Sequence, residues 1–218
     1  MAGLLEERGS LQERFEKWDL AKIDFEQAFE IFQREGNWRR ALIMRIRLVD
    51  ILRRTDLAEA ERLLREEILP EAEQGDDLRV QTVAREVLEH ILVNQGKLSD
   101  TLVLLNERQL PAWQELGDRR ALALTTMRMA SLWLHLDRSK DEALDLLQKS
   151  TTFFKETRES FHLAQALSGT TVILVGQGKY DEALRILQEQ LPVFERFGNP
   201  TTISITRSMI ELLQSSGK

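Results

Sequence analysis

The feature that most constrains this chain is an internal repeat of about 40 residues. A column of glycines marks the repeat at Gly36, Gly75, Gly117 and Gly198, and Arg158 stands at the one place in this column without a glycine. A helix pair of this size cannot bury its own apolar face, so successive pairs must stack and share a core. The repeat therefore predicts a solenoid, an architecture that typically serves binding.

Three further columns support the repeat. A small residue stands early in most second helices, at Ala21, Ala60, Ala143 and Ala183, with Leu102 as the exception. An aromatic residue precedes the glycine column at Phe32, Trp113, Phe154 and Phe194, whereas Glu71 takes this place in the second repeat. Three prolines fall in one column, at Pro70, Pro111 and Pro192. We expect the small residues to let helices approach closely, the rings to fill the core, and the prolines to bend their helices.

The helical period of the apolar residues predicts an all-α fold. The expected eleven helices lie at about 4–17, 19–35, 38–54, 57–74, 77–95, 98–116, 119–136, 141–157, 160–176, 180–197 and 200–214. They form one domain, 1–218, of five antiparallel pairs at about 1–36, 37–75, 76–117, 118–158 and 159–198, closed by the helix at 200–214. Glycine favours the left-handed conformation that ends a helix, so we place helix ends at Gly36, Gly75, Gly96, Gly117, Gly178 and Gly198.

The turn and helix opening at 178–184, Gly-Lys-Tyr-Asp-Glu-Ala-Leu, and the segment 141–144, Asp-Glu-Ala-Leu, resemble tetratricopeptide repeats. The repeat is longer than the usual 34 residues of that family, and is similar to a longer bacterial variety. The resemblance implies a right-handed superhelix whose first helices line a concave groove for a peptide, a helix or another protein's surface. Arg138, Leu102 and Arg158 depart from the family pattern, where glycine, alanine and glycine are usual.

Composition predicts a soluble protein of the cytoplasm. Hydrophobic residues make up 42% of the chain, charged residues 30%, and the formal net charge is -6, which are ordinary globular values. Cysteine is absent, which removes disulfides, thiolate metal sites and cysteine nucleophiles. The first ten residues lack the apolar run of a secretory signal, and no stretch is long and apolar enough to span a membrane.

The sequence offers little for catalysis. His90, His135 and His162 lie on three different first helices, and the glycines are helix terminators rather than phosphate-binding loops. Adjacent carboxylates such as Glu66 and Glu67 point about 100° apart on a helix. We therefore predict a protein that is not an enzyme and that holds no metal and no cofactor.

An arginine stripe is the one basic feature of an acidic chain. Arg40, Arg47 and Arg54 are seven residues apart and share one helix face. One interpretation is a solvated face paired with acids of neighbouring helices, such as Glu66, Glu67 and Glu71, and the other is a dock for an acidic partner. Nucleic acid binding would need a more extensive positive groove, so we predict no nucleic acid partner.

The family resemblance implies which first-helix residues line the groove, with the helical phase open by one residue. They are Asp50 and Arg53 on the second first helix, Thr82, Arg85 and Glu89 on the third, Thr125, Arg128, Leu132 and His135 on the fourth, and Gln165 and Ser168 on the fifth. Arg85 and Arg128 would then stack and grip a carboxylate or peptide carbonyls. The family's lysine and asparagine carboxylate clamp is not matched. The alternative is that this face binds nothing and the convex surface or an end does the work.

The two ends differ in pattern. Leu4, Leu5, Leu11, Phe15 and Trp18 form one stripe on an otherwise charged helix, as expected of a finished amino-terminal cap. The last helix spreads its apolar residues over half of its surface, at Ile203, Ile205, Met209, Ile210, Leu212 and Leu213. Self-association through this helix, or a further domain in a longer protein, would cover them.

These patterns together predict a protein-interaction scaffold or adaptor that binds a peptide or protein surface on the concave first-helix face. A ligand sensor that gates an effector through superhelix curvature is one alternative, and a structural homo-oligomer is another.

Overall fold

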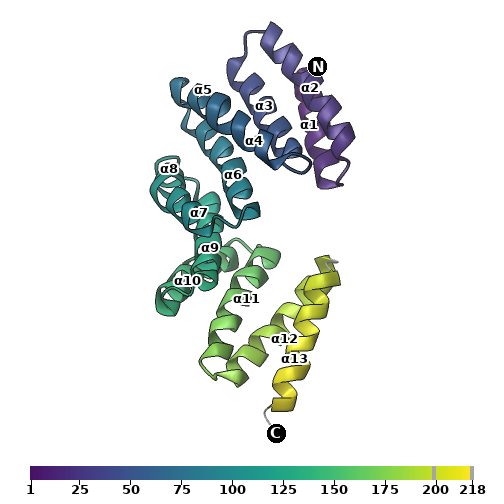
Figure 1. Cartoon of the computed structure of the whole chain (residues 1–218). Helices are drawn as coiled ribbons and strands as arrows, with labels where there is room; N and C mark the ends of the chain where they lie inside the picture. Colours follow the sequence, from purple (N-terminus) through teal and green to yellow (C-terminus); the bar gives the residue numbers. More distant parts are fainter. Residues whose placement is uncertain (198–199, 217–218) are drawn as a thin grey trace. The chain divides into compact units, whose positions relative to one another are not determined.

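The computed structural model describes residues 1–197 and 200–216, and in this part of the chain all regular structure is helical, as predicted (Figure 1). The helices are α1 (Ala2–Arg14), α2 (Trp18–Arg34), α3 (Trp38–Leu52), α4 (Leu57–Leu63), α5 (Leu69–Gln74), α6 (Leu78–Asn94), α7 (Leu98–Leu104), α8 (Leu110–Glu115), α9 (Arg119–His135), α10 (Lys140–Glu156), α11 (Ser160–Gly176), α12 (Tyr180–Phe197) and α13 (Pro200–Ser216). Two π-helical segments, Leu64–Ile68 and Leu105–Gln109, join α4 to α5 and α7 to α8, so the predicted eleven helices are confirmed.

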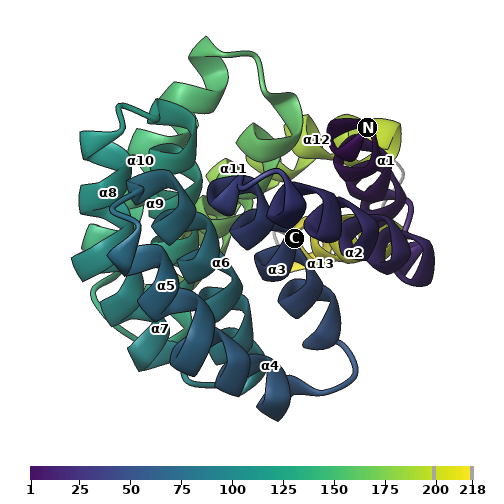
Figure 2. The same cartoon turned by 90° about the horizontal axis from the view of Figure 1, so that it is seen from above.

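The chain divides into two compact units, Met1–Leu116 and Gly117–Lys218, at a predicted boundary between helix pairs. In the first unit α1 packs on α2, α2 on α3, and α3 on α6, as Figures 1 and 2 show. In the second unit each helix from α9 to α13 packs on the next, and α9 also contacts α11. Each unit thus has the nearest-neighbour packing of a helical repeat.

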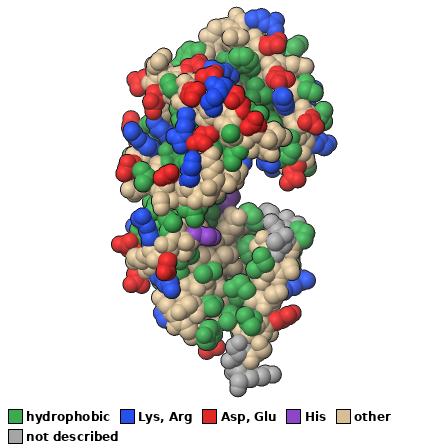
Figure 3. All heavy atoms as spheres, viewed as in Figure 1, with side chains coloured by type: hydrophobic (Ala, Val, Ile, Leu, Met, Phe, Trp, Pro, Cys, Tyr) green, Lys and Arg blue, Asp and Glu red, His purple; other side chains and the backbone are tan. Residues whose placement is uncertain are grey.

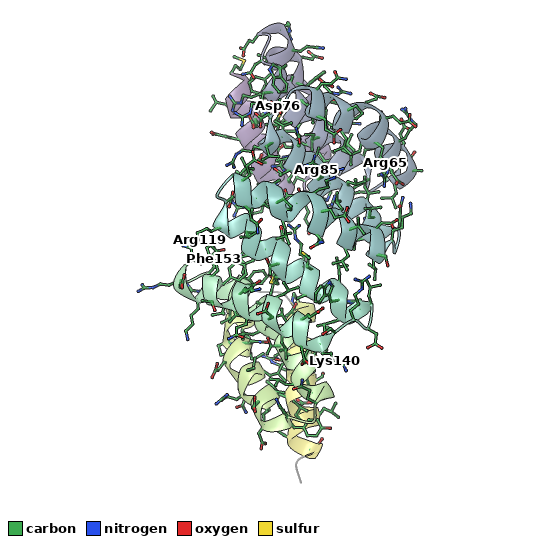
Figure 4. All side chains as sticks on the ribbon, turned by 90° about the vertical axis from the view of Figure 1, so that its left-hand side faces the viewer. Arg65, Asp76, Arg85, Arg119, Lys140 and Phe153 are labelled. Atoms are coloured by element: carbon green, nitrogen blue, oxygen red, sulfur yellow. The ribbon has the colours of Figure 1, made fainter. Side chains whose placement is uncertain are left out.

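The hydrophobic core consists of successive clusters that follow the sequence repeat. One cluster joins α1, α2 and α3, another joins α3 through α6, and those of the second unit join α9, α10 and α11 and then α11, α12 and α13. The aromatic column is buried at Phe32, Trp113, Phe154 and Phe194, as predicted. In the second unit Phe154 also stacks on the His162 ring, and Phe153 lies beneath the guanidinium of Arg119 (Figure 4).

The proline column has two structural outcomes. Each π-helical segment stands directly before a Leu-Pro pair, at Pro70 and at Pro111. Proline cannot donate a backbone hydrogen bond and its ring collides with the carbonyl four residues earlier, so a π turn relieves the helix there. Pro192 lies inside the continuous helix α12.

The predicted left-handed glycines are confirmed at four helix ends, whereas at Gly75 the helix ends as predicted but the glycine is not left-handed. Gly36, Gly96, Gly117 and Gly178 have φ between 66° and 74°. Gly75 instead has φ of -75°, and Asp76 takes the left-handed conformation at 49°. A Cβ on Gly75 would lie 2.5 Å from the Trp38 ring, so glycine stands there to admit that ring. Gly198 lies outside the described residues.

The left-handed residue at the vacant place in the glycine column is Arg158, with φ of 59°. Arg158→Gly should raise the free energy of unfolding by roughly 0.5–1 kcal/mol, because an L-residue is strained in this region and glycine is not. Urea denaturation followed by circular dichroism measures the change. Gly178→Arg, at φ of 74°, is the matched control and should destabilise. A loss of stability in Arg158→Gly would refute this account of the column.

Candidate protein-binding face

The register between α3 and α6 is marked by a polar contact. His90 Nδ1 of α6 lies 3.4 Å from Asp50 Oδ1 of α3, and these two residues are one repeat apart. Arg53 Nε donates to the same oxygen at 2.5 Å. Burial alone would raise the pKa of Asp50, but the hydrogen bonds from His90 and Arg53 outweigh it and lower the pKa to about 2.

The arginine stripe of α3 faces α1. Arg40 Nη2 lies 2.7 Å from Glu6, and Arg47 Nη1 lies 3.9 Å from Glu13. The sequence offers Glu66, Glu67 and Glu71 as acids that would pair with this stripe, but these residues pair with other arginines. Glu67 and Glu71 instead contact Arg45, which is off the stripe, and Glu66 contacts Arg62. Figure 3 shows acidic and basic side chains interspersed over this part of the first unit. Two of the three arginines of the stripe therefore pair with acids of α1.

Arg54, at the end of the stripe, has a different environment. Its guanidinium lies 3.4 Å from the centre of the Trp18 ring, a stacking geometry that favours a cation. In the described part of the chain no carboxylate forms an ion pair with it. Arg54 and Trp18 also line a cavity of about 690 Å³ together with Leu48, Leu52 and Leu63. An apolar recess thus adjoins an exposed guanidinium.

These residues form what we call the first-helix face: Glu13 of α1, Arg47, Asp50 and Arg54 of α3 and its end, and His90 and Val93 of α6. Arg47, His90 and Val93 are nearly half exposed, whereas Glu13 and Asp50 sit lower between the helices. Burial raises the pKa of Glu13. The negative charge of Asp50 raises this pKa further, whereas the positive charges of Arg47 and Arg54 lower it. The face therefore exposes basic and apolar side chains to solvent, and the carboxylates of Glu13 and Asp50 lie beneath them in contact with Arg47 and His90.

The predicted groove residues on α6 lie in the interior of the first unit. Thr82 is fully buried and donates to the Arg79 carbonyl at 2.8 Å, and Glu89 is 3% exposed. Arg85 is 8% exposed, points in among the helices in Figure 4, and donates to Gln81 Oε1 at 3.0 Å. Burial lowers the pKa of Arg85. On this helix the partly exposed positions come one residue after the predicted ones, His90 after Glu89 among them.

On α9 of the second unit the predicted residues are divided between buried and exposed positions. Thr125 and Leu132 are buried, and Arg128 Nη2 lies 3.4 Å from Thr125 Oγ1. His135 is exposed at the end of α9, with Nδ1 2.7 Å from the Ser131 carbonyl.

On α11 the predicted phase agrees with exposure. Gln165 is exposed, and Ser168 is half-buried and donates to Gln190 Oε1 at 3.3 Å. Arg85 belongs to the first unit and Arg128 to the second, so their proposed stacking stays a prediction.

Glu13, His90, Val93 and Trp18 were not among the predicted site residues. The sequence carries a signal for two of them. Asp50 and His90 are 40 residues apart, which is the repeat itself, and Glu6 and Glu13 repeat the seven-residue spacing of Arg40 and Arg47.

Among the described residues there is neither a membrane-spanning helix nor a metal-binding cluster. No helix there is long and apolar enough to cross a membrane. No group of three or more histidine, aspartate or glutamate side chains there could hold a metal ion.

Asp50→Asn tests the electrostatics of the face. Because the folded pKa of about 2 lies below the ordinary 3.8, the ionised Asp50 stabilises the fold above about pH 4, and this contribution is lost as pH falls towards 2. The variant should lose about 2 kcal/mol of stability at pH 7 and show a flatter decline between pH 4 and 2. Urea unfolding across this pH range measures both, and His90→Ala, which removes one of the two partners, should flatten the decline partly. Identical pH profiles for Asp50→Asn and the parent protein would contradict the prediction.

No protein-family model matches the chain, and no curated protein matches it. Among solved structures, BtubC (BKLC) from P. vanneervenii is similar, with a TM-score of 0.72 at 18% sequence identity. The similarity covers 98% of this chain and 84% of that chain. At this identity the similarity concerns the fold alone, and it supports a helical repeat architecture.

Proposed function

We propose that this chain is a non-catalytic protein-interaction module of tetratricopeptide type, acting as a scaffold or adaptor. The helix-opening segments at 141–144 and 178–184 and the nearest-neighbour packing of helix pairs support the family assignment. The observation that carries the binding role is the first-helix face, where side chains of three successive first helices meet. A row of this kind suits an extended partner segment that crosses several helices.

The chemistry of the face favours an acidic peptide segment. Arg47 and His90 project outward, and the Arg47–Glu13 separation of 3.9 Å leaves that guanidinium only loosely paired. A partner carboxylate could form a closer, bidentate contact with Arg47 or with Arg54 on its Trp18 platform. The cavity beside Arg54 would receive an apolar side chain next to the acidic one. Binding should weaken as salt concentration rises, because exposed charges are screened.

Site-directed photocrosslinking tests which face binds. A photoreactive amino acid replaces Val93 on α6, and as a matched control Val103 on α7, which is similarly exposed at 52% against 43%. In extracts of the source cells, a protein should crosslink through position 93 and not through position 103. Crosslinks only through position 103 would move binding to the second-helix side, and none from either position would refute the interaction role of this unit.

Charge substitutions on the same captured protein test the acidic-partner chemistry. The Arg47→Gln, Arg54→Gln pair should weaken its binding at least tenfold, which corresponds to about 1.4 kcal/mol. The control pair Arg34→Gln, Lys149→Gln removes the same charge from exposed positions on α2 and α10 and should have little effect. Equal loss in both pairs would indicate non-specific attraction and not a defined face.

The other sequence predictions stand as proposals beside this one. We propose a cytoplasmic protein with a peptide or protein partner and without a nucleic acid or membrane partner. The ligand-sensor alternative and self-association through α13 stay predictions.

A further inference from the structure

The amino-terminal helix exposes its apolar stripe. Leu4, Leu11 and Phe15 are 50–72% exposed, whereas the residues of α1 that are buried are the small Ala2 and Gly9. The predicted finished cap is therefore wrong, since a cap turns its apolar stripe inward and a polar face outward. Glu6 and Glu13, which face α3, lie about 200° around the helix from Leu4 and Leu11. The exposed stripe is thus separate from the first-helix face.

We propose that the exposed stripe of α1 packs against the same stripe of a second copy of this chain, forming a two-fold symmetric homodimer. A two-fold interface requires a self-complementary surface, in which residue i meets residue j and j meets i. The α1 surface meets this requirement in both its apolar and its charged positions.

The complementarity follows from the spacing along α1. If two antiparallel copies cross near residue 10, Leu4 of one copy and Phe15 of the other stand at the same level along the helix axis, to within about one residue or 1.5 Å of rise. Glu7 of one copy and Arg14 of the other then match in level equally well, and the symmetry repeats both pairs. Glu7 and Arg14 are exposed beside the stripe, 7 residues apart in their own helix and out of reach of each other. Opposite charges therefore flank a shared apolar seam.

The neighbouring helix enlarges the surface. Ile23 of α2 is about half exposed, and Arg8, within the α1 stripe, is drawn towards α2 by its 2.5 Å contact with the buried Asp24. A stable interface needs on the order of 800 Å² from each partner, more than a helix of 13 residues offers alone. The α1–α2 pair together supplies the additional apolar area.

Sedimentation velocity of the full chain over a range of concentrations tests the proposal. The parent protein should dimerise, and Leu11→Glu should shift the dimerisation constant at least tenfold towards monomer with unchanged helicity. Leu212→Glu, at an exposed leucine of α13, is the matched control and should leave the dimer intact. A monomer at every concentration, or a dimer lost in Leu212→Glu and kept in Leu11→Glu, would overturn the proposal.

A charge swap tests the antiparallel arrangement itself. Glu7→Arg and Arg14→Glu should each weaken the dimer, since each places like charges opposite each other, and the double variant should restore it. The swap is on the surface, so it tests the interface without disturbing the core. Failure of the double variant to recover dimerisation would exclude this pairing.

Discussion

Gly9→Ala should lower the free energy of unfolding by roughly 2 kcal/mol, although alanine is the better helix former. A Cβ on Gly9 would lie 2.5 Å from the Phe25 ring, closer than packed atoms allow. Phe25 is fully buried in the core shared by α1, α2 and α3, so its ring has no free space into which it could move. The added methyl group must push α1 away from α2.

Gly3 in the same helix is the matched control. A Cβ there would meet only the Arg40 side chain, at 3.6 Å, which is an ordinary contact. Gly3→Ala should therefore leave the stability unchanged or raise it by up to about 1 kcal/mol through helix propensity. Urea denaturation of both variants measures the contrast. Equal effects at the two positions would show that α1 does not depend on close contact at Gly9.

The fold was predictable because the columns of the repeat have local causes. The buried alanines and the buried aromatic rings stand where the sequence repeats them, and each helix end with a left-handed glycine follows from the freedom of that residue. Gly75 looked the same in sequence but serves the Trp38 ring from another helix. A contact between residues so far apart in the chain produces no pattern in the local sequence, so the sequence predicted the wrong role for Gly75.

The first-helix face was harder to predict, because α6 is buried on several sides. Thr82 and Glu89 are buried between helices although they are polar, so polarity alone suggests the wrong phase by one residue. The ion pairs from Glu6 and Glu13 to the arginine stripe depend on how α1 lies beside α3. The exposed stripe of α1 looked like a cap for the same reason: periodicity shows that a helix has an apolar face, and only packing shows which way that face turns.

The small-residue column supplies the second large effect, since Leu102 and Ala143 occupy the same place in different repeats. Both are buried, Leu102 at 5% and Ala143 at 0% exposure. Ala143 packs with Ala130, Leu147 and Ile173, in a core with no room for three more carbon atoms. Each repeat has therefore adjusted its helix packing to its own residue, and exchanging the two should destabilise the fold in both directions.

Leu102→Ala should cost about 2–4 kcal/mol through lost apolar burial and a cavity, and Ala143→Leu about 1–3 kcal/mol through overpacking. The exposed neighbours supply the controls. Val103→Ala and Gln148→Leu change side-chain size on the same helices and should each shift stability by less than about 0.5 kcal/mol. Chemical denaturation of the four variants decides the matter. If Ala143→Leu proved as stable as the parent protein, close helix approach would not be the reason for alanine in this column, because a leucine would then fit in both repeats.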